Sequence, residues 1–542
     1  MAQNTLLLIE ATRIQDYIFG SNELKQIIGA SELVQQATQD WVFAALAKLP
    51  LPVNVQLDAK EPDGWKITAP LLAGNWAAQV IYAGGGNAVI LFANPEEARK
   101  FARELSFKVL RDAPGLLIIE TQQPFDPTSQ SLKDELNNLR KAAAQRKRTP
   151  PRSAPLLGLG VTAACVYTGA PAVDRRDRRW ISREAQFKQD AAKPGETRLR
   201  RHLRDIQLAG FGFISDFDQL GERGEASYMA LIHTDGNGMG QRIEKHGQEF
   251  SAPADNEKYA QAQHAFSEKV KEVARIALNR TVGMLLHPAN QERDDKGRLS
   301  IRGKAPMPRD REDRTVELLP FRPIVFGGDD VTFVSEGRIG LSIAARYIGE
   351  FAAQSLADGK PAAARAGVAV VKSHYPFARA YDLADELCVS AKGRVKELSR
   401  PDLPPTVTAL DWHFAVSGLV LPLAEIRERE YSVRDGSLLM RPVALHTAEG
   451  DWRSWEAFTE TTLAFQEDKE WRGQRNKVKA LRDALRGGPD AVKLFLPGKS
   501  LPQTLGTAEL ADSGWDIAAK RCGYFDAVEA LDFYVRLEGE SV

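Results

Sequence analysis

The sequence lacks the features of secreted and membrane-spanning proteins. It holds only three cysteines in 542 residues, Cys165, Cys388 and Cys522, and none of them forms a CxxC pair. This argues against a disulfide framework or a structural zinc site and favours a reducing compartment. No apolar run is long enough to span a bilayer, and the start MAQNTLLLIEATR has too short an apolar core for a signal peptide. We therefore expect a cytoplasmic protein without membrane contact.

The sequence also lacks a net charge. Its 72 Lys and Arg residues balance 72 Asp and Glu residues. A protein whose whole surface binds nucleic acid is thereby disfavoured, although local basic stretches are still compatible with such contact. With 43% hydrophobic and 27% charged residues, a chain of this length predicts three or four ordinary globular domains.

The stretch FRPIVFGGDDVTFV, residues 321–334, predicts a tight β-hairpin. Its turn holds Gly327, Gly328, Asp329 and Asp330. Glycine permits positive φ and lets a bulky anion approach the backbone. Two carboxylates about 4 Å apart repel by roughly 4 kcal/mol at an effective dielectric of about 20, so a site that gathers them usually holds a cation. Oxygen ligands favour Mg²⁺ or Mn²⁺. The alternative is an exposed turn with solubilising aspartates.

A third carboxylate follows an apolar run upstream. Tyr228 to Thr234 predicts a buried strand, and Asp235 stands at its end before a glycine-rich turn. Such a turn before a helix is where backbone N–H groups cradle phosphates. We expect Asp235, Asp329 and Asp330 to hold one or two metal ions and to be the catalytic residues. The residues expected to bind nucleotide around them are Gly236, Asn237, Gly238, Gly327 and Gly328. A strand, turn and helix that bind nothing is the alternative.

An earlier stretch, QVIYAGGGNAVILFAN, repeats the hairpin pattern around Gly84, Gly85, Gly86 and Asn87. Aligned on the turns, Gly86 and Asn87 fall where the second hairpin has its two aspartates. The opening strand LLLIE likewise places Glu10 where the later strand has its aspartate. The sequence therefore predicts an internal repeat whose first copy lacks the hairpin carboxylates.

The strand that ends at Asp235 and the GGDD hairpin, together with AGVAVVKSHYPFARAYDLADELCVSAK and TALDWHF, resemble the catalytic palm of the large polymerase-cyclase subunit of type III CRISPR complexes. They span residues 228–413. The resemblance implies a ferredoxin-like palm that condenses ATP into cyclic oligoadenylate with a divalent metal, and a degenerate first palm that completes a pocket for two nucleotides. It also implies that Ser21, Gly84 and Gly85 line the second nucleotide and that Lys392 binds phosphate. A cation favoured by the dipole at a helix C-terminus explains Lys392 equally well.

We therefore predict an α+β protein with two ferredoxin-like palms, the first degenerate and the second of GGDD type, a linker region and a helical C-terminal domain. The expected boundaries are 1–122, 123–220, 221–415 and 416–542. Within the linker, residues 174–204 hold eleven Lys or Arg against five Asp or Glu. This run predicts either contact with RNA phosphates or a solvated helix. Residues 287–317 are polar and charged, and we expect a surface loop or a partly disordered flap there.

Some features of the family are missing. No His-Asp dipeptide occurs, so we expect no HD nuclease domain, and the cysteine pairs of a zinc segment are absent. Asn237 replaces a second acidic residue, which leaves three carboxylates for the metal. The leading hypothesis is an antiviral nucleotidyltransferase or cyclase acting on NTPs, with ATP favoured. The alternatives are a non-catalytic nucleotide-binding scaffold of a CRISPR-type ribonucleoprotein and a stand-alone dinucleotide cyclase. Partnership with RNA or with sibling subunits stays open.

Overall fold

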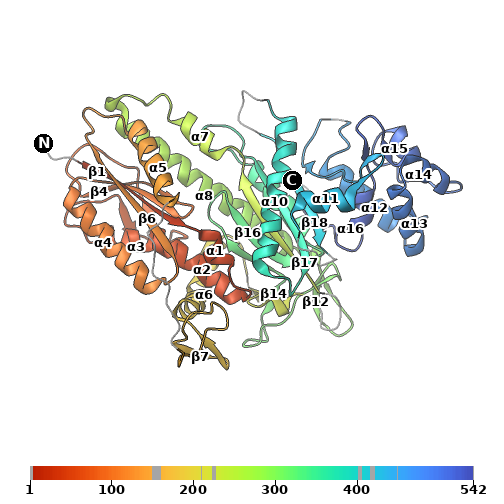
Figure 1. Cartoon of the computed structure of the whole chain (residues 1–542), viewed down its shortest axis with the longest axis horizontal. Coiled ribbons are helices and arrows are strands. Elements are labelled where there is room, and N and C mark those ends of the chain that lie inside the picture. The colour runs from red at the N-terminus through yellow and green to blue at the C-terminus, as the bar shows by residue number, and fades with distance from the viewer. Residues whose placement is uncertain are drawn as a thin grey trace.

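Two β-sheets with covering helices form most of the molecule, and a smaller helical part lies at one end (Figure 1). The computed structural model describes residues 4–148, 160–208, 210–221, 227–400, 406–415, 421–448 and 450–540. The predicted α+β class is confirmed. The predicted boundary at 416 lies outside the described residues.

The first sheet has the strand order β4-β5-β1-β6, and each neighbouring pair is antiparallel. Strand β1 is buried on both faces because Leu7 and Ile9 join the core under α2 and α4, whereas Leu6 and Leu8 pack with α5 on the other face. Successive strand residues point to opposite faces, which explains the unbroken apolar run of this strand. The elements of this part are β1 (Asn4–Thr12), α1 (Ile14–Phe19), α2 (Leu24–Gln35), a π-helical turn (Gln36–Asp40), α3 (Trp41–Leu46), β2 (Val55–Leu57), β3 (Trp65–Ile67), β4 (Ala78–Gly84), β5 (Asn87–Phe92), α4 (Pro95–Asp112), β6 (Leu117–Phe125) and α5 (Leu132–Arg148).

The second sheet has the order β15-β16-β10-β17-β18-β21. Its buried strands pack against α8, α9 and α10, and Figure 1 shows α10 lying across this sheet. The elements are β10 (Tyr228–Gly236), α7 (Met239–His246), α8 (Asn256–Leu286), β15 (Phe321–Val325), β16 (Val331–Glu336), α9 (Gly340–Ala352), β17 (Ala364–Lys372), α10 (Phe377–Leu398), β18 (Ala409–Ala415) and β21 (Val443–Ala444).

Four strands of each sheet repeat one topology. In both, the strands stand in the order second, third, first, fourth along the chain, as in a β-α-β-β-α-β unit. Glu10 of β1 pairs with Asn87 of β5. In the second sheet Thr234 pairs with Val331, so Asp235 and Asp330 stand one position further along the same two strands. The strand registers therefore match Glu10 with Asp235 and Asn87 with Asp330, as the sequence alignment predicts.

Helix α6 (Arg183–His202) belongs to the segment between the sheets and packs closely on α2. A Cβ atom on Gly29 of α2 would lie 1.6 Å from the backbone oxygen of Lys188, so only glycine fits at this crossing. On the facing helix, a Cβ atom on Gly195 would lie 3.2 Å from Ile28. The two helices approach each other through glycines.

We expect Gly29→Ala to force α2 and α6 apart and to lower the free energy of unfolding by about 1–3 kcal/mol, as overpacked sites do. Gly283→Ala is the matched control because a Cβ atom there, inside α8, would meet nothing within 4 Å. Alanine should stabilise that helix by roughly 0.5–1 kcal/mol. Urea unfolding of both variants measures the difference. An unfolding midpoint for Gly29→Ala at or above that of the control would contradict the close crossing.

The basic run 174–204 forms a short hairpin and α6, and part of its charge is internal. The hairpin strands are β7 (Asp174–Arg176) and β8 (Arg179–Ile181). Arg198 is buried and donates to Glu32 at 2.8 Å and to Asp63 at 3.0 Å. This arginine holds α6 to the first half of the chain. Part of the positive charge of this run is therefore buried in ion pairs and is not exposed on the surface.

The polar segment 287–317 is more ordered than the sequence predicts. It forms a three-stranded sheet, and its end pairs in parallel with a strand from the inter-sheet segment. The prediction of a loop or flap is wrong, because Leu299, Ile301 and Ala305 are buried and join the hydrophobic core of the second sheet, which fixes the small sheet in place. The strands are β9 (Phe211–Phe213), β11 (Gln291–Arg293), β12 (Leu299–Ile301), β13 (Ala305–Pro306) and β14 (Glu317–Leu319).

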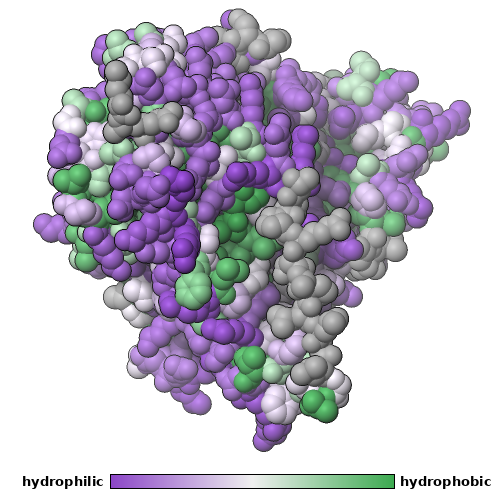
Figure 2. All heavy atoms as spheres, turned by 60° about the vertical axis from the view of Figure 1, so that its left-hand side comes forward, coloured by the Kyte–Doolittle hydropathy of each residue, from purple (hydrophilic) through white to green (hydrophobic). Residues whose placement is uncertain are grey.

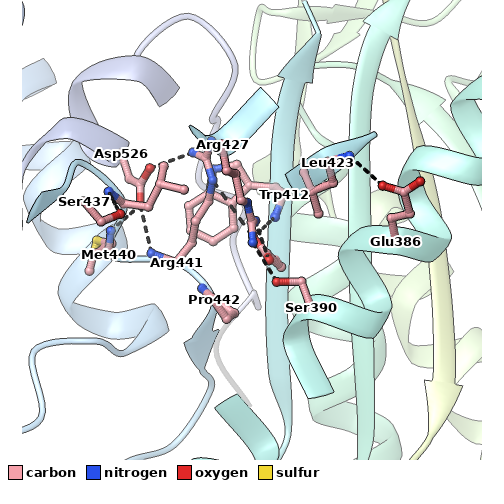
Figure 3. Close-up of polar contacts among 12 residues, drawn as sticks. Glu386, Ser390, Trp412, Leu423, Arg427, Ser437, Met440, Arg441, Pro442 and Asp526 are labelled. Carbon is pink, nitrogen blue, oxygen red and sulfur yellow. Dashed lines mark hydrogen bonds and ion pairs between the residues drawn. The ribbon is translucent and has the colours of Figure 1, made fainter. Parts of the chain in front are cut away.

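Helices are the main regular elements of the last part of the chain, which also contains a small sheet of order β19-β20-β23-β22. A buried ionic cluster joins it to the second sheet (Figure 3). Arg441 donates to Asp526 at 2.6 Å and to Glu529 at 3.1 Å, and Arg427 donates to Asp411 of β18 at 2.6 Å. The elements are α11 (Leu423–Tyr431), β19 (Ser432–Val433), β20 (Gly436–Ser437), α12 (Trp455–Glu467), α13 (Arg475–Arg486), α14 (Pro489–Phe495), α15 (Ala508–Ser513), β22 (Trp515–Asp516), β23 (Arg521–Cys522) and α16 (Phe525–Ala530).

Hydrophilic residues dominate the face of the molecule that Figure 2 shows, and hydrophobic residues gather in a patch near its centre. Within the described ranges, no helix is both long and apolar enough to cross a bilayer.

Candidate functional site

The predicted second hairpin is confirmed. Strands β15 and β16 enclose a turn of residues 326–330, and a bulge between Pro323 and Val325 interrupts the pairing before it. Gly327 has a φ of 99°, which side chains other than glycine rarely adopt. A Cβ atom on Gly328 would meet nothing within 4 Å, so the backbone is open to a ligand at this point.

The end of β10 lies against this turn. A Cβ atom on Gly236 would lie 2.8 Å from the Cβ atom of Asp329, so the missing side chain lets the hairpin approach the strand that carries Asp235. Gly238 has a φ of 68° at the start of α7 and turns the chain away from the sheet. The structure thus brings together the strand end and the GGDD turn, although they are far apart in sequence.

Arg365 of β17 lies beside Asp235, and sequence reasoning missed it. Its guanidinium is hydrogen-bonded to the Asp235 carboxylate and donates to Asn237 Oδ1 at 2.9 Å. Asn237 is itself buried, and its amide nitrogen donates to the backbone oxygen of Val407 at 2.8 Å. The oxygen and the nitrogen of the Asn237 side-chain amide therefore both have hydrogen-bond partners within the protein. Its predicted contact with nucleotide stays a prediction.

The two hairpin aspartates lack such compensation. Burial raises the pKa of Asp329 to about 6, and the charges of Asp235 and Asp330 add to this rise. Enclosure by protein, with the charges of Asp235 and Asp385, raises the pKa of Asp330 to about 7. Solvent reaches 60% of the Asp330 side chain and partly screens its charge. Gathered carboxylates of this kind favour a proton or a cation among them.

His233 and Asp385 complete the surroundings of Asp330. The buried His233 ring places Nδ1 at 3.6 Å from Asp330 and Nε2 at 3.5 Å from Asp385. His233 stands two positions before Asp235 on the same strand, so both side chains point to one face of the sheet. Asp385 comes from α10, which packs so tightly on β17 that a Cβ atom on Gly367 would lie 2.0 Å from the backbone oxygen of Ala384. Because alternate residues of a strand share one face, the sequence could have placed His233 beside Asp235, whereas no sequence signal indicated Asp385.

The three predicted aspartates are neighbours but do not form a ready ligand set. In the part of the chain that the structure describes, no group of three or more His, Cys, Asp or Glu side chains is arranged to hold a metal ion. Asp235 is instead bonded to Arg365. The donor chemistry nevertheless fits Mg²⁺ or Mn²⁺, because all three are oxygen ligands and the raised pKa values of Asp329 and Asp330 reflect unrelieved negative charge.

One pocket is lined by both hairpins. Its volume is about 380 Å³, within the range of ligand sites, and residues 84–87 and 327–330 line it together. Gly85 and Gly86 have φ values of 58° and 80°, so the first turn is as tight as predicted. Lys271 of α8 also lines the pocket, and its Cε lies 3.4 Å from an ideal Cβ on Gly84. Its ammonium pairs with Glu268 at 2.8 Å and lies on a side chain next to a glycine turn, where it could also meet a phosphate, and no sequence signal indicated it.

Ser21 and Lys392 do not line this pocket, and neither do the predicted residues at the end of β10, which are Asp235, Gly236, Asn237 and Gly238. Ser21 is buried, and its Oγ accepts the backbone N–H of Glu23 at 3.1 Å. Lys392 is exposed on α10, which continues to Leu398. The helix end expected near Lys392 is wrong, so the dipole at a helix C-terminus does not explain this lysine. Nucleotide binding by either residue stays a prediction.

The geometry is that of a pocket shared by two related β-α-β-β-α-β units, of which only the second carries hairpin carboxylates. No family model and no curated protein matches the sequence. Solved structures do match the fold. The Csm1-Csm4 cassette in complex with AMPPNP matches over 98% of this chain and 70% of that chain, with 14% identity and a TM-score of 0.53.

Two further structures of the Csm1-Csm4 cassette give the same result. The apo form has a TM-score of 0.53 and the complex with cA4 one of 0.52, each at 14% identity over 98% of this chain and 69% of that chain. At this identity the comparison establishes the fold. The chain has a Csm1-like fold, and the predicted resemblance to the large subunit of type III CRISPR complexes is confirmed at that level.

Proposed function

We propose that this chain is a palm-type nucleotidyltransferase that condenses ATP, or another NTP, into cyclic oligonucleotides as part of a CRISPR-type antiviral complex. The observation that carries the proposal is the pocket lined by both hairpins, with aspartates at the second hairpin alone. Solved structures of the same fold hold AMPPNP, pppApApA or cA4, which supports nucleotide as the ligand class.

In this proposal the two β-α-β-β-α-β units are ferredoxin-like palms. Residues 1–122 form the degenerate palm and 221–415 the active one, with 123–220 as the linker and 416–542 as the helical domain. A sibling subunit is the expected partner, since the matching structures contain Csm1 together with Csm4. Contact with RNA is part of the proposal for the assembled complex.

Asp235, Asp329 and Asp330 are the residues that would hold Mg²⁺ or Mn²⁺. Such a cation would neutralise the triphosphate, lower the pKa of the attacking ribose hydroxyl and stabilise the departing pyrophosphate. Arg365 orients Asp235 in the absence of metal, and His233 lies 3.6 Å from Asp330 and orients that carboxylate. These two residues position the carboxylates and do not touch the substrate.

In this proposal the remaining residues of the pocket bind phosphate. Gly327 and Gly328 leave the hairpin backbone bare, so a triphosphate can approach its N–H groups. Lys271 supplies a cation from the opposite side of the pocket, next to Gly84. Two nucleotides held in this way would present one ribose to the other triphosphate, which converts a bimolecular reaction into one within a single complex.

A non-catalytic nucleotide-binding scaffold is the second candidate. The observation that favours it is the ion pair between Arg365 and Asp235, which occupies one of the three proposed metal ligands. A scaffold of this kind would bind NTP in the same pocket without turnover. The two functions therefore differ in products and not in ligand.

The test is to incubate the purified full chain with each labelled NTP and Mg²⁺ or Mn²⁺, alone and with candidate RNA activators and the partner subunit, and to resolve the products by mass. Cyclic oligoadenylates from ATP are the expected products. Nucleotide binding without turnover in every mixture would favour the scaffold. Linear or cyclic dinucleotides from the isolated chain would point to a stand-alone dinucleotide cyclase.

A further inference from the structure

A second and larger concavity lies far from the hairpins, between the second sheet and the C-terminal helices. Its volume is about 1260 Å³. We call it the basic groove, because among the described residues seven Lys or Arg side chains and four carboxylates line it, whereas the chain as a whole carries no net charge. The lining comes from the turn after β12, from α12 and α13, and from residues 528–536. In Figure 1, α13 lies at the end of the molecule opposite the first sheet.

The cations of one wall form a stripe on α13. Arg475, Lys479 and Arg482 stand at positions i, i+4 and i+7, which places them on one helical face. All three are exposed, whereas Leu481 and Leu485 anchor the other face in the core. The stripe extends over about 10 Å at a rise of about 1.5 Å per residue. This length suits several successive phosphates better than a single small anion.

The opposite wall carries Arg302 and Lys304, both exposed in the turn between β12 and β13. The Arg302 guanidinium donates to the backbone oxygen of Ala289 at 3.2 Å and has no carboxylate partner among the described residues. Cations from two walls therefore face one channel.

Among the lining cations Arg338 pairs with Glu336 at 2.7 Å, whereas the stripe on α13 is not neutralised by a carboxylate in the described residues. In the described part of the chain, Arg475 and Lys479 make no ion pair, and Arg482 lies over the Phe525 ring at 5.7 Å. The carboxylate of Glu529, in contrast, is already used by Arg441. Like charges held together without partners favour an anion between them.

We propose that the basic groove binds single-stranded nucleic acid through its phosphates. The stripe faces into a concavity, whereas a helix that reads a duplex must project into the major groove. The aromatic residues of the lining are buried or half-buried, so they offer no open stacking platforms, and recognition is independent of sequence. RNA and DNA share this backbone chemistry, and the groove is separate from the nucleotide pocket. The inference does not depend on the proposed function.

The test measures binding of a fluorescent oligo(U) and a fluorescent oligo(dT) to the full chain by anisotropy, without NTP, over a range of KCl concentrations. Each phosphate contact with a single strand contributes about 0.7 to the slope of log affinity against log salt. Removing the three-cation stripe should therefore lower this slope by about 2, equally for both sequences. The groove variant combines Arg475→Ala, Lys479→Ala and Arg482→Ala.

The matched control removes three exposed cations from α4, in the first half of the chain, and should leave the slope unchanged. It combines Arg99→Ala, Lys100→Ala and Arg103→Ala. Alanine favours helix at all six positions, so both variants should fold, and thermal unfolding verifies this. Arg302→Ala with Lys304→Ala, on the opposite wall, should lower the slope by about 1.4. Absence of binding by the wild type would overturn the inference, as would equal slopes for the wild type and the groove variant. If the wild type bound oligo(U) more tightly than oligo(dT) with the same salt slope for both, groups other than the phosphates would be recognised, which would contradict the inference.

Discussion

Asp330→Ala is expected to reduce nucleotide condensation by at least about a hundredfold, the scale on which single electrostatic catalytic groups act. The reason is the loss of one of three proposed metal ligands from the second hairpin. The fold should survive, because the side chain is 60% exposed and its removal relieves repulsion from Asp235 and Asp385. Turnover of labelled ATP, with thermal unfolding alongside, measures both effects.

Glu10→Ala is the matched control. Glu10 occupies the equivalent strand position in the first sheet, pairs with Asn87 and forms an ion pair with Lys147. The first hairpin has no carboxylates, so we expect turnover close to that of the wild type. Unchanged turnover in Asp330→Ala would remove the second hairpin from the reaction, and equal losses in both variants would make the two hairpins equivalent.

The second large effect concerns stability. Arg441→Met should lower the free energy of unfolding by about 3–5 kcal/mol, because removing one partner of a buried ion pair leaves an uncompensated charge. Arg441 and Asp526 are both fully buried, and Asp526 also accepts the backbone N–H groups of Met440 and Arg441 (Figure 3). Arg429→Met is the control, since this arginine of α11 is exposed and pairs with Glu425 on the surface. Its removal should cost less than about 0.5 kcal/mol.

The decrease in the free energy of unfolding caused by Arg441→Met should depend on pH. Burial raises the pKa of Asp526 to about 6, against the lowering effect of Arg441. When the pKa of a carboxyl is higher in the folded than in the unfolded state, its protonation stabilises the folded state. This stabilisation is fully present below the unfolded pKa and is lost as pH rises through the folded pKa. Without Arg441 the folded pKa rises further. The variant should therefore be most destabilised relative to wild type at pH 8, and less so at pH 5, where Asp526 takes up a proton. Urea unfolding at both pH values tests this, and an equal loss at each would contradict it.

The sequence predicted local structure well where turn chemistry decides it. Both hairpins, the strand that ends at Asp235 and the repeat between the two sheets follow from glycines that the turns require and from apolar runs that the sheets bury. The small sheet within 287–317 was missed because a few buried residues, such as Leu299 and Ile301, are outnumbered by charged ones. Helix α10 continues to Leu398 through Gly393, a residue that usually signals a helix end, because Arg394 and Val395 beyond it are buried and hold the last turns against the protein.

The surroundings of the candidate site were less predictable. Arg365 meets Asp235 only because β10 and β17 are neighbours in the sheet. Asp385 and Lys271 reach the site from helices that pack on the sheets from other parts of the sequence. Isolated charged residues of this kind are usually solvated, so composition and spacing do not single them out. Tertiary packing selects them, and it becomes visible only in three dimensions.

The most direct test of the account is a crystal structure of the full chain with Mn²⁺ and AMPPNP, in which anomalous scattering locates the manganese. We predict a manganese peak bonded to a carboxylate oxygen of Asp329 or Asp330 and to the nucleotide phosphates, with Asp235 released from Arg365 to join them. Nucleotide bound in the pocket without manganese at these aspartates, or manganese bound elsewhere, would contradict the account.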